Sequence, residues 1–328
     1  MKRVVGILCS ACCLTGLVAE ASAQTTAPDA PQVFAPGVIS GPANEDSAAF
    51  TPDGDTVFFD RIHWPNAAIM VSHRVNGSWS APTVAPFSGQ WLDHDPAMSP
   101  DGTFIVFSSN RPDADGGKAL DAVMANGKVL AGSGGHLWRV ERKGNGWGKP
   151  VRLPDTVNSS SRTYAPSVVA DGSVYFQRPG DDDDFRLFRS QYSNGTYLPP
   201  VPVMLGEASA HKLDPAVAPD ESFIVFDANF TGKDDPDRLY IAFRDGEGWS
   251  KPIDLGDGIN VKGPWGSHLG PDHRTLYFSS TRSIPVHYPR TPQQAQDDIA
   301  RMQWDNGNDN IWSVSLAPWL DAHRASGG

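Results

Sequence analysis

Five short apolar runs recur along the chain, each directly after a turn sequence that contains Pro-Asp or Asp-Gly. The runs are Thr56–Phe59, Phe104–Phe107, Val174–Phe176, Phe223–Phe226 and Leu276–Phe278. An Asp-Gly pair between two β-rich runs indicates a hairpin, because a tight turn needs a positive φ that glycine tolerates. A repeat of roughly 50 residues with strands in every copy is typical of a β-propeller.

Each copy divides into four expected strands, called a to d in chain order. Strand a leads into the turn, strand b is the apolar run, and strand d opens with an aromatic residue after a glycine in the first four copies. The expected c strands are Ile69–Ser72, His136–Val140, Arg186–Arg189, Arg238–Ile241 and Asn310–Val314. The fifth copy lacks a strand d. We expect the leftover extended piece, Val33–Ile39, to supply that strand and close the ring, which removes exposed edges.

Two long insertions separate strands b and c. One spans residues 112–135 and contains a hairpin signal at Ala122–Leu130, and the other spans residues 283–309 and can form a short helix over Gln293–Met302. Neither insertion is long enough to be a whole blade. The sequence therefore predicts an all-β, single five-bladed propeller, with six blades as the alternative, and both insertions are candidate lids.

The first 23 residues have the pattern of a cleavable targeting segment. Lys2 and Arg3 precede an apolar run over Val4–Val18, and Ala21-Ser-Ala23 is a small-residue cleavage site. We expect cleavage after Ala23 and a periplasmic or secreted protein. The predicted organisation is a signal peptide at 1–23, a flexible N-terminus at 24–32, the propeller at 33–318 and a C-terminal tail at 319–328.

Charge and cysteine content narrow the function classes. The net charge is −11, and all three cysteines, Cys9, Cys12 and Cys13, lie in the targeting segment. The chain after Ala23 then has no disulfide, and its acidity argues against nucleic-acid binding, which needs a basic field. The apolar run is too short to span a membrane, so no span is expected after cleavage. We predict a monomer.

The phrase from Asp95 to Pro112, which reads Asp-Pro-Ala-Met-Ser-Pro-Asp-Gly-Thr-Phe-Ile-Val-Phe-Ser-Ser-Asn-Arg-Pro, resembles the WD40-like propeller repeat of the TolB type. The resemblance extends from about Val33 to Leu316. It implies a β-propeller in the cell envelope that binds a partner. TolB-like propellers usually have six blades, whereas five repeats are recognisable here.

Strand alternation predicts which residues share a face. The starts of the a strands, the ends of the b strands and the b–c loops should lie together, opposite the Pro-Asp-Gly turns. Loops at a channel mouth are common binding sites. The candidate catalytic residues there are His94, His211, His268, Tyr164, Asp93, Asp95 and Asp214. Each histidine is also compatible with an ordinary surface position, and no metal-binding histidine spacing occurs.

Four arginines follow b strands and form a second candidate set. The predicted ligand-binding residues are Arg61, Arg111, Arg178 and Arg282, together with His63 and Trp265. Arginine binds carboxylate or sulfate with two parallel hydrogen bonds, which would suit an anionic ligand. The alternative is that each arginine pairs with an acidic residue of its own or the next blade.

The acidic run Asp181–Asp184 leaves calcium binding open, since hard cations prefer carboxylate oxygens. A solvated acidic loop is the plainer interpretation. No metal site is assigned on this basis, and calcium is the one cofactor that the sequence leaves open.

Two function hypotheses remain. The first is a binding or scaffold module that holds a protein segment or a glycan at the channel mouth, so that the partner is an envelope protein or an acidic or neutral glycan.

The second is a carbohydrate-active enzyme. A glycoside hydrolase would use two carboxyl groups drawn from Glu45, Asp93, Asp95 and Asp214. A uronate polysaccharide lyase would use arginine to neutralise the sugar carboxylate and histidine or Tyr164 as the base. The sequence does not decide whether the protein is an enzyme.

Overall fold

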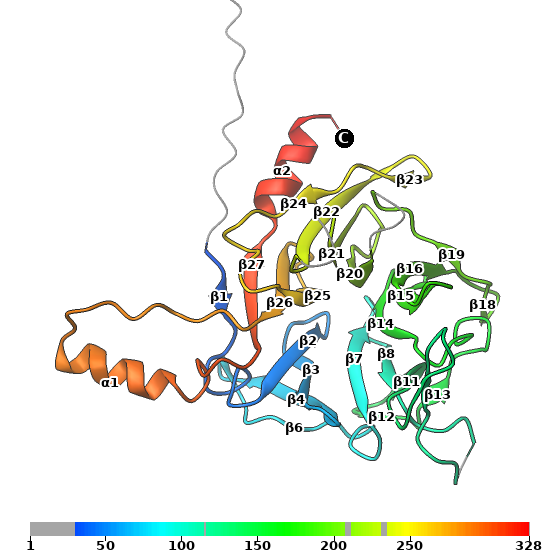
Figure 1. Ribbon diagram of the computed structural model, residues 1–328, viewed down its shortest axis with the longest axis horizontal. Helices are drawn as coiled ribbons and strands as arrows, with labels where there is room; N and C mark the ends of the chain where they lie inside the picture. Colours follow the sequence, from blue (N-terminus) through cyan, green and yellow to red (C-terminus); the bar gives the residue numbers. More distant parts are fainter. Residues whose placement is uncertain (1–29, 115, 207–210, 231–234, 328) are drawn as a thin grey trace, which may run out of the picture.

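The structure is a computed structural model that describes residues 30–327 except 115, 207–210 and 231–234. Its described part is a ring of five antiparallel blades (Figure 1). Residues of all five innermost strands line a cavity along the axis of the ring, called the channel below. Five blades are therefore confirmed, and the six-bladed alternative is wrong. The predicted signal peptide lies outside the described residues.

Blades 1 to 4 are each built from strands that follow one another in sequence, with strand a innermost. Blade 1 contains β2 (Asn44–Phe50), β3 (Thr56–His63), β4 (Asn66–Val75), β5 (Ser78–Trp79) and β6 (Thr83–Val84); blade 2 contains β7 (Asp93–Met98), β8 (Phe104–Ser109), β11 (His136–Lys143), β12 (Gly146–Trp147) and β13 (Val151–Arg152). Blade 3 contains β14 (Tyr164–Val168), β15 (Val174–Pro179), β16 (Phe185–Ser190), β17 (Tyr192–Ser193), β18 (Thr196–Tyr197) and β19 (Val201–Pro202). Blade 4 contains β20 (Lys212–Val217), β21 (Phe223–Ala228), β22 (Arg238–Asp245), β23 (Gly248–Trp249) and β24 (Ile253–Asp254).

Blade 5 contains β25 (Trp265–Leu269), β26 (Thr275–Ser280), β27 (Asn310–Ser315) and the N-terminal strand β1 (Gln32–Val33). Val33 pairs with Trp312 of β27, and the Phe34 N–H donates to the Ile311 carbonyl at 2.8 Å. The predicted closure of the ring by the N-terminus is observed. The strand is shorter than the predicted Val33–Ile39, because positive φ values at Ala35 and Gly37 turn the chain away from β27.

The apolar core lies between neighbouring blades. Phe58 and Ile69 of blade 1 pack with Ile105 and Phe107 of blade 2, and equivalent clusters join the other blades. Because successive side chains of a strand point to opposite faces, each blade contributes to the core on both of its sides. The polar groups of the innermost strands are left to line the channel.

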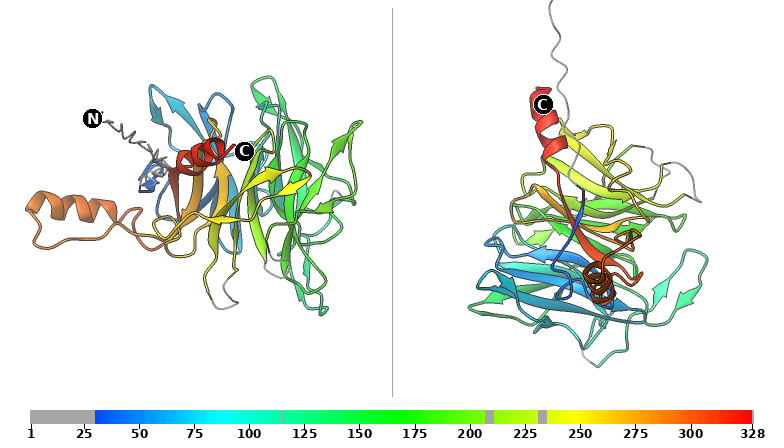
Figure 2. Two further views of the ribbon diagram at one scale, coloured as in Figure 1. Left: turned by 90° about the horizontal axis from the view of Figure 1, so that it is seen from above. Right: turned by 90° about the vertical axis from the view of Figure 1, so that its left-hand side faces the viewer.

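The two insertions form the elements that the sequence predicts. The first contains the hairpin β9 (Ala122–Val123) and β10 (Val129–Leu130), and the second contains α1 (Pro292–Arg301), which begins at a Thr291 capping box. Helix α1 projects sideways from blade 5 and does not lie over the channel (Figures 1 and 2). In this arrangement the second insertion is an arm and not a lid.

Most of the predicted C-terminal tail is helical. Helix α2 spans Ala317–Ala325, and Trp319 and Leu320 pack against the core between blades 4 and 5. The His323 ring stacks on Phe243 with ring centroids 3.9 Å apart. The helix thereby fastens the end of the last blade to its neighbour.

Candidate functional site

Every innermost strand carries a β-bulge at the same level of the channel. In each strand the register shifts directly after the pairs Asp46–Asp60, His94–Ser108, Tyr164–Gln177, Leu213–Asp227 and Trp265–Ser279. The residue that follows adopts a positive φ: 55° at Ser47, 52° at Asp95, 48° at Ala165, 45° at Asp214 and 64° at Gly266. A bulge leaves one residue unpaired and redirects the local side chains. Here it turns backbone N–H groups toward the preceding blade.

Acidic and amide side chains accept hydrogen bonds from these exposed N–H groups. Asp95 N–H donates to Asp60 Oδ2 at 2.6 Å, and Ala165 N–H donates to Asp95 Oδ2 at 3.0 Å. Asp214 N–H donates to Gln177 Oε1 at 2.8 Å, and Gly266 N–H donates to Asp214 Oδ2 at 3.0 Å. A buried N–H must find an acceptor, so the polar lining of the channel also joins neighbouring blades.

A pocket of about 550 Å³ opens beside this bulge layer. The starts of the a strands, the ends of the b strands and the b–c loops form its wall, as strand alternation predicts. The residues that matter for its chemistry are Trp64, His94, Asp95, Tyr164, Asp214, Asp227, Asp237 and Trp265. The wall thus combines aromatic rings with carboxyl groups.

The aromatic part of the wall is continuous. The ring centroids of Trp64 and His94 lie 5.8 Å apart, and those of His94 and Tyr164 lie 5.7 Å apart. Trp64 remains 58% exposed, although a large aromatic side chain usually becomes buried in the core. The Tyr164 hydroxyl donates to the Ser133 carbonyl at 3.1 Å, and burial raises the pKa of this phenol above its usual range.

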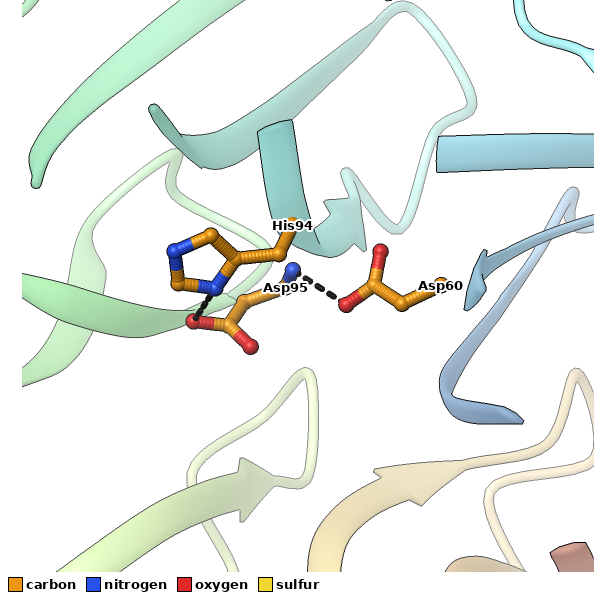
Figure 3. Close-up of side chains that lie close together, drawn as sticks. All are labelled: Asp60, His94 and Asp95. Atoms are coloured by element: carbon orange, nitrogen blue, oxygen red, sulfur yellow. Dashed lines mark hydrogen bonds and ion pairs between the residues drawn. The ribbon is translucent and has the colours of Figure 1, made fainter. Parts of the chain in front are cut away.

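His94 and Asp95 form an ion pair at the inner end of the pocket. His94 Nδ1 lies 2.9 Å from Asp95 Oδ2, and the two side chains come from consecutive residues of strand β7 (Figure 3). Burial alone would raise the pKa of Asp95, but His94 and the donors Ala165 N–H and Ser108 Oγ–H outweigh it and lower this pKa to about 2. Burial opposes protonation of His94, yet the charge of Asp95 raises the pKa of this imidazole above its usual value.

Two pairs of carboxyl groups, Asp46 with Asp60 and Asp214 with Asp227, have raised pKa values, in contrast to Asp95. Asp46 and Asp60 lie opposite each other in the β2–β3 pairing, and both are fully buried. Burial and the repulsion between acidic groups raise the pKa of each well above the ordinary value. Burial and repulsion from Asp95 also raise the pKa of Asp214 to about 7, and the pKa of the neighbouring Asp227 is raised as well. One site therefore contains an ionised carboxylate, Asp95, and carboxyl groups that hold protons near neutral pH.

The predicted arginine ring is not at this pocket. Arg61 pairs with Glu45 at 3.0 Å, and the buried Arg111 pairs with Asp93 at 2.7 Å. Arg178 donates to the Ser159 hydroxyl and stacks on Phe188, and Arg282 donates to the carbonyls of Gly258 and Ile259. Within the described part of the chain, no arginine lines the pocket. Arg61 and Arg111 follow the alternative interpretation, in which each arginine pairs with an acidic residue.

The remaining predicted residues lie in several places. His211 Nε2 is 2.6 Å from Oδ1 of Asp237, which lines the pocket, whereas His211 is not among the lining residues. His268 lines a different, smaller cavity beside the Pro-Asp-Gly turns, and burial lowers its pKa to about 4. His63 is exposed at the end of β3. Asp93 is buried and accepts hydrogen bonds from Ser88, Ser109 and Arg111, which gives it a structural role.

The acidic run Asp181–Asp184 is partly neutralised by arginines of the protein itself. Asp183 lies 2.6 Å from Arg162 and also accepts the Ala125 N–H, and Asp182 lies 2.9 Å from Arg186. These ion pairs give the run a structural explanation. Calcium binding there stays a prediction.

Sequence reasoning named five residues of the pocket and gave no role to three others. His94, Asp95, Tyr164, Asp214 and Trp265 are the five. Trp64 and Asp227 fall on the predicted face but have no motif around them, and Asp237 lies in a b–c loop without any alternation. The bulge layer that gathers these residues leaves only a partial signal in the sequence: a proline, Pro96, Pro166 or Pro215, follows the positive-φ residue in three of the five strands.

None of the described helices is long and apolar enough to cross a membrane. No protein-family model matches the chain, and no curated protein sequence matches it.

Solved structures do share the architecture. A putative TolB from Agrobacterium tumefaciens is 17% identical with a TM-score of 0.47, and the match covers 76% of this chain and 74% of that protein. TolB from Acinetobacter baumannii is 14% identical with a TM-score of 0.47, and the match covers 84% of this chain and 56% of that protein. The α-L-arabinofuranosidase PaAbf62A from Podospora anserina, in complex with cellotriose, is 12% identical with a TM-score of 0.48, and the coverages are 87% and 96%. TolB proteins are thus among the structural neighbours, and at these identities the likeness is one of propeller fold.

Proposed function

We propose that the protein is an exported binding module whose channel-mouth pocket holds a segment of a neutral glycan. The observation that carries this proposal is the wall of the pocket, where exposed Trp64 and the partly buried Trp265 and Tyr164 stand beside Asp95, Asp214 and Asp237. Aromatic faces pack against the apolar C–H faces of sugar rings, and carboxylates accept hydrogen bonds from sugar hydroxyls.

The charge of the pocket favours a neutral ligand over an acidic one. Its described titratable residues are His94, Tyr164 and four aspartates, and His94 is already paired with Asp95. A uronate carboxylate would enter next to acidic groups without the arginine that normally binds it. The raised pKa of Tyr164 also makes this residue a poor base. The uronate lyase hypothesis therefore has little support from the geometry.

Binding by the aromatic wall can be tested with Trp64→Ala and Trp265→Ala. A panel of neutral oligosaccharides identifies the ligand, and calorimetry then compares the variants with the original protein. Each variant should lose about tenfold or more in affinity, because a stacked aromatic anchor usually carries a large share of binding energy. Tyr288→Ala is the matched control, since Tyr288 is a 76% exposed aromatic on the α1 arm. Unchanged affinity in both tryptophan variants, or preference for a peptide, would argue against the proposal.

Glycoside hydrolysis is the second candidate, and a specific observation favours it. Burial and neighbouring charges separate the pKa values of two carboxyl groups of one pocket, to about 2 for Asp95 and about 7 for Asp214. Such a separation gives one ionised carboxylate, suited to the nucleophilic or charge-stabilising role, and one proton donor at neutral pH. Of the four carboxyl groups considered from the sequence, Glu45 and Asp93 form ion pairs with arginines. Asp95 and Asp214 are the two that remain.

Product chromatography with neutral polysaccharides tests this candidate. If hydrolysis occurs, Asp214→Asn should reduce product release by at least about 100-fold while it retains oligosaccharide binding, because the amide cannot donate an acidic proton. If no substrate that the pocket binds gives products, binding without catalysis is the function that remains. Equal rates for Asp214→Asn and the original protein would exclude Asp214 as the acid.

A further inference from the structure

We propose that the inner end of the pocket is a divalent-cation site, in which Asp60, Asp95 and His94 are the ligands and Asp46 supplies further negative charge. The three ligand residues each offer an atom, and these atoms lie within 4.8 Å of one another (Figure 3). Separations of this size suit a cation bound at about 2.0–2.6 Å from each atom. The inference does not depend on the identity of the pocket ligand.

The unpartnered oxygens of the cluster are the second observation. When both groups are ionised, no described residue donates a hydrogen bond to either carboxylate oxygen of Asp46 or to Asp60 Oδ1. Both side chains are 0% exposed, so water at the surface cannot serve as the missing donor. Buried polar oxygens usually have a partner, and a carboxylate without one is costly. A bound cation would satisfy these oxygens.

The local charge balance supports the same conclusion. Asp46 lies opposite Asp60 in the β2–β3 pairing, the Asp95 N–H donates to Asp60 Oδ2 at 2.6 Å, and Asp95 Oδ2 lies 2.9 Å from His94 Nδ1. Three carboxyl groups, those of Asp46, Asp60 and Asp95, are thus gathered around a single imidazole. Protons can neutralise part of this charge, but a divalent cation neutralises two charges at once and needs no acidic pH.

The ligand set also indicates which cation would fit. Two carboxylates and one imidazole form a mixed oxygen and nitrogen set, which suits Mn²⁺ and leaves Ca²⁺ as a competitor for the oxygen ligands. His94 and Asp95 also line the pocket, so the remaining coordination positions of the cation would face it. A hydroxyl of a pocket ligand could occupy one of them.

The experiment is a titration of chelator-treated protein with MnCl₂, followed by calorimetry, thermal unfolding and electron paramagnetic resonance. We expect one Mn²⁺ per chain, a rise of several degrees in Tm, and nitrogen coupling from one imidazole. CaCl₂ should displace Mn²⁺. Asp60→Asn should weaken Mn²⁺ binding by at least tenfold, because it removes a charged ligand from a site of only three.

The matched control is Asp227→Asn, which changes another fully buried carboxyl of the same channel that is not in the three-residue group. This variant should bind Mn²⁺ like the original protein. Absence of Mn²⁺ and Ca²⁺ binding in folded protein would overturn the proposal. Equal affinity of Asp60→Asn and the original protein would overturn it too, as would loss of binding in Asp227→Asn alone. Circular dichroism of each variant verifies that it is folded.

Discussion

Arg111→Leu should lower the free energy of unfolding by roughly 3–5 kcal/mol, because it leaves a buried charge without its partner. Arg111 Nη2 lies 2.7 Å from Asp93 Oδ1, and the same guanidinium donates to Ser109 Oγ and to the Phe87 carbonyl. Its carbon also stacks over the Trp138 ring at 5.3 Å. The substitution therefore removes an ion pair, hydrogen bonds and an aromatic contact with β11 of the same blade together.

Urea unfolding followed by tryptophan fluorescence measures this loss. The control is Arg274→Leu, which breaks a surface pair with Asp321 whose side chains are 38% and 59% exposed. A surface ion pair contributes at most about 1 kcal/mol, so this variant should differ little from the original protein. If Arg111→Leu were as stable as the control and had lost glycan binding, Arg111 would be a ligand residue after all.

The second large effect is on the pH dependence of stability. In chelator-treated protein, the free energy of unfolding should fall as pH rises from 5 to 7, by about 1.4 kcal/mol per pH unit for each carboxyl with a raised pKa. Burial raises the pKa of Asp214 to about 7 and raises that of Asp227. The ordinary pKa of an aspartate in the unfolded chain is about 4. Between that pH and the raised pKa values of the folded protein, the folded protein holds protons that the unfolded chain has released, so each rise in pH favours unfolding. The raised pKa of His94 acts in the same direction.

Asp227→Asn provides the test of the cause. The amide has nearly the same shape, carries no charge and can donate to Asp214, so the variant should be more stable than the original protein at pH 8 by about 1–3 kcal/mol. Its stability should also change less between pH 5 and pH 8. Urea unfolding at a series of pH values measures both effects. Parallel pH profiles for the two proteins would show that the Asp214–Asp227 pair does not hold the proton.

The blades could be predicted because they depend on local signals that repeat. Turns such as Pro52–Gly54 fix the hairpins, and the apolar runs after them fix the buried b strands. The missing fifth strand d and the unassigned segment near Val33 also made the closure of the ring predictable. Each of these inferences uses only a few neighbouring residues and the demand that strand edges be paired.

The site was only partly predictable because the residue pattern at the bulges is incomplete: a proline follows the positive-φ residue in three of the five strands, but not after Ser47 or Gly266. Ser47, Asp95, Ala165 and Asp214 all adopt positive φ, although their side chains differ and none is glycine. His268 shows the consequence. It lies beyond the bulge and pairs with Tyr277, two residues from the Ser279 that pairs with Trp265. Strands rise about 3.3 Å per residue, so His268 is about 7 Å further along the channel than Trp265.

The arginines show a different limit of sequence reasoning. Arg111 and Arg282 follow the b strands β8 and β26 as predicted, whereas Arg61 and Arg178 lie within β3 and β15. In neither case does position determine the direction of a long side chain. Arg111 and Arg282 turn back between the blades, where aromatic rings and backbone carbonyls bind the guanidinium. A carboxylate or carbonyl of the protein itself satisfies an arginine as well as a ligand does, and only the folded structure distinguishes the two.

The most direct test of the central claim is a crystal structure with the tightest-binding neutral oligosaccharide. The account predicts that a sugar ring packs against Trp64 or Trp265 and that its hydroxyls donate to Asp95, Asp214 or Asp237. An oligosaccharide bound at the Pro-Asp-Gly face, or along the α1 arm with the channel mouth empty, would contradict it.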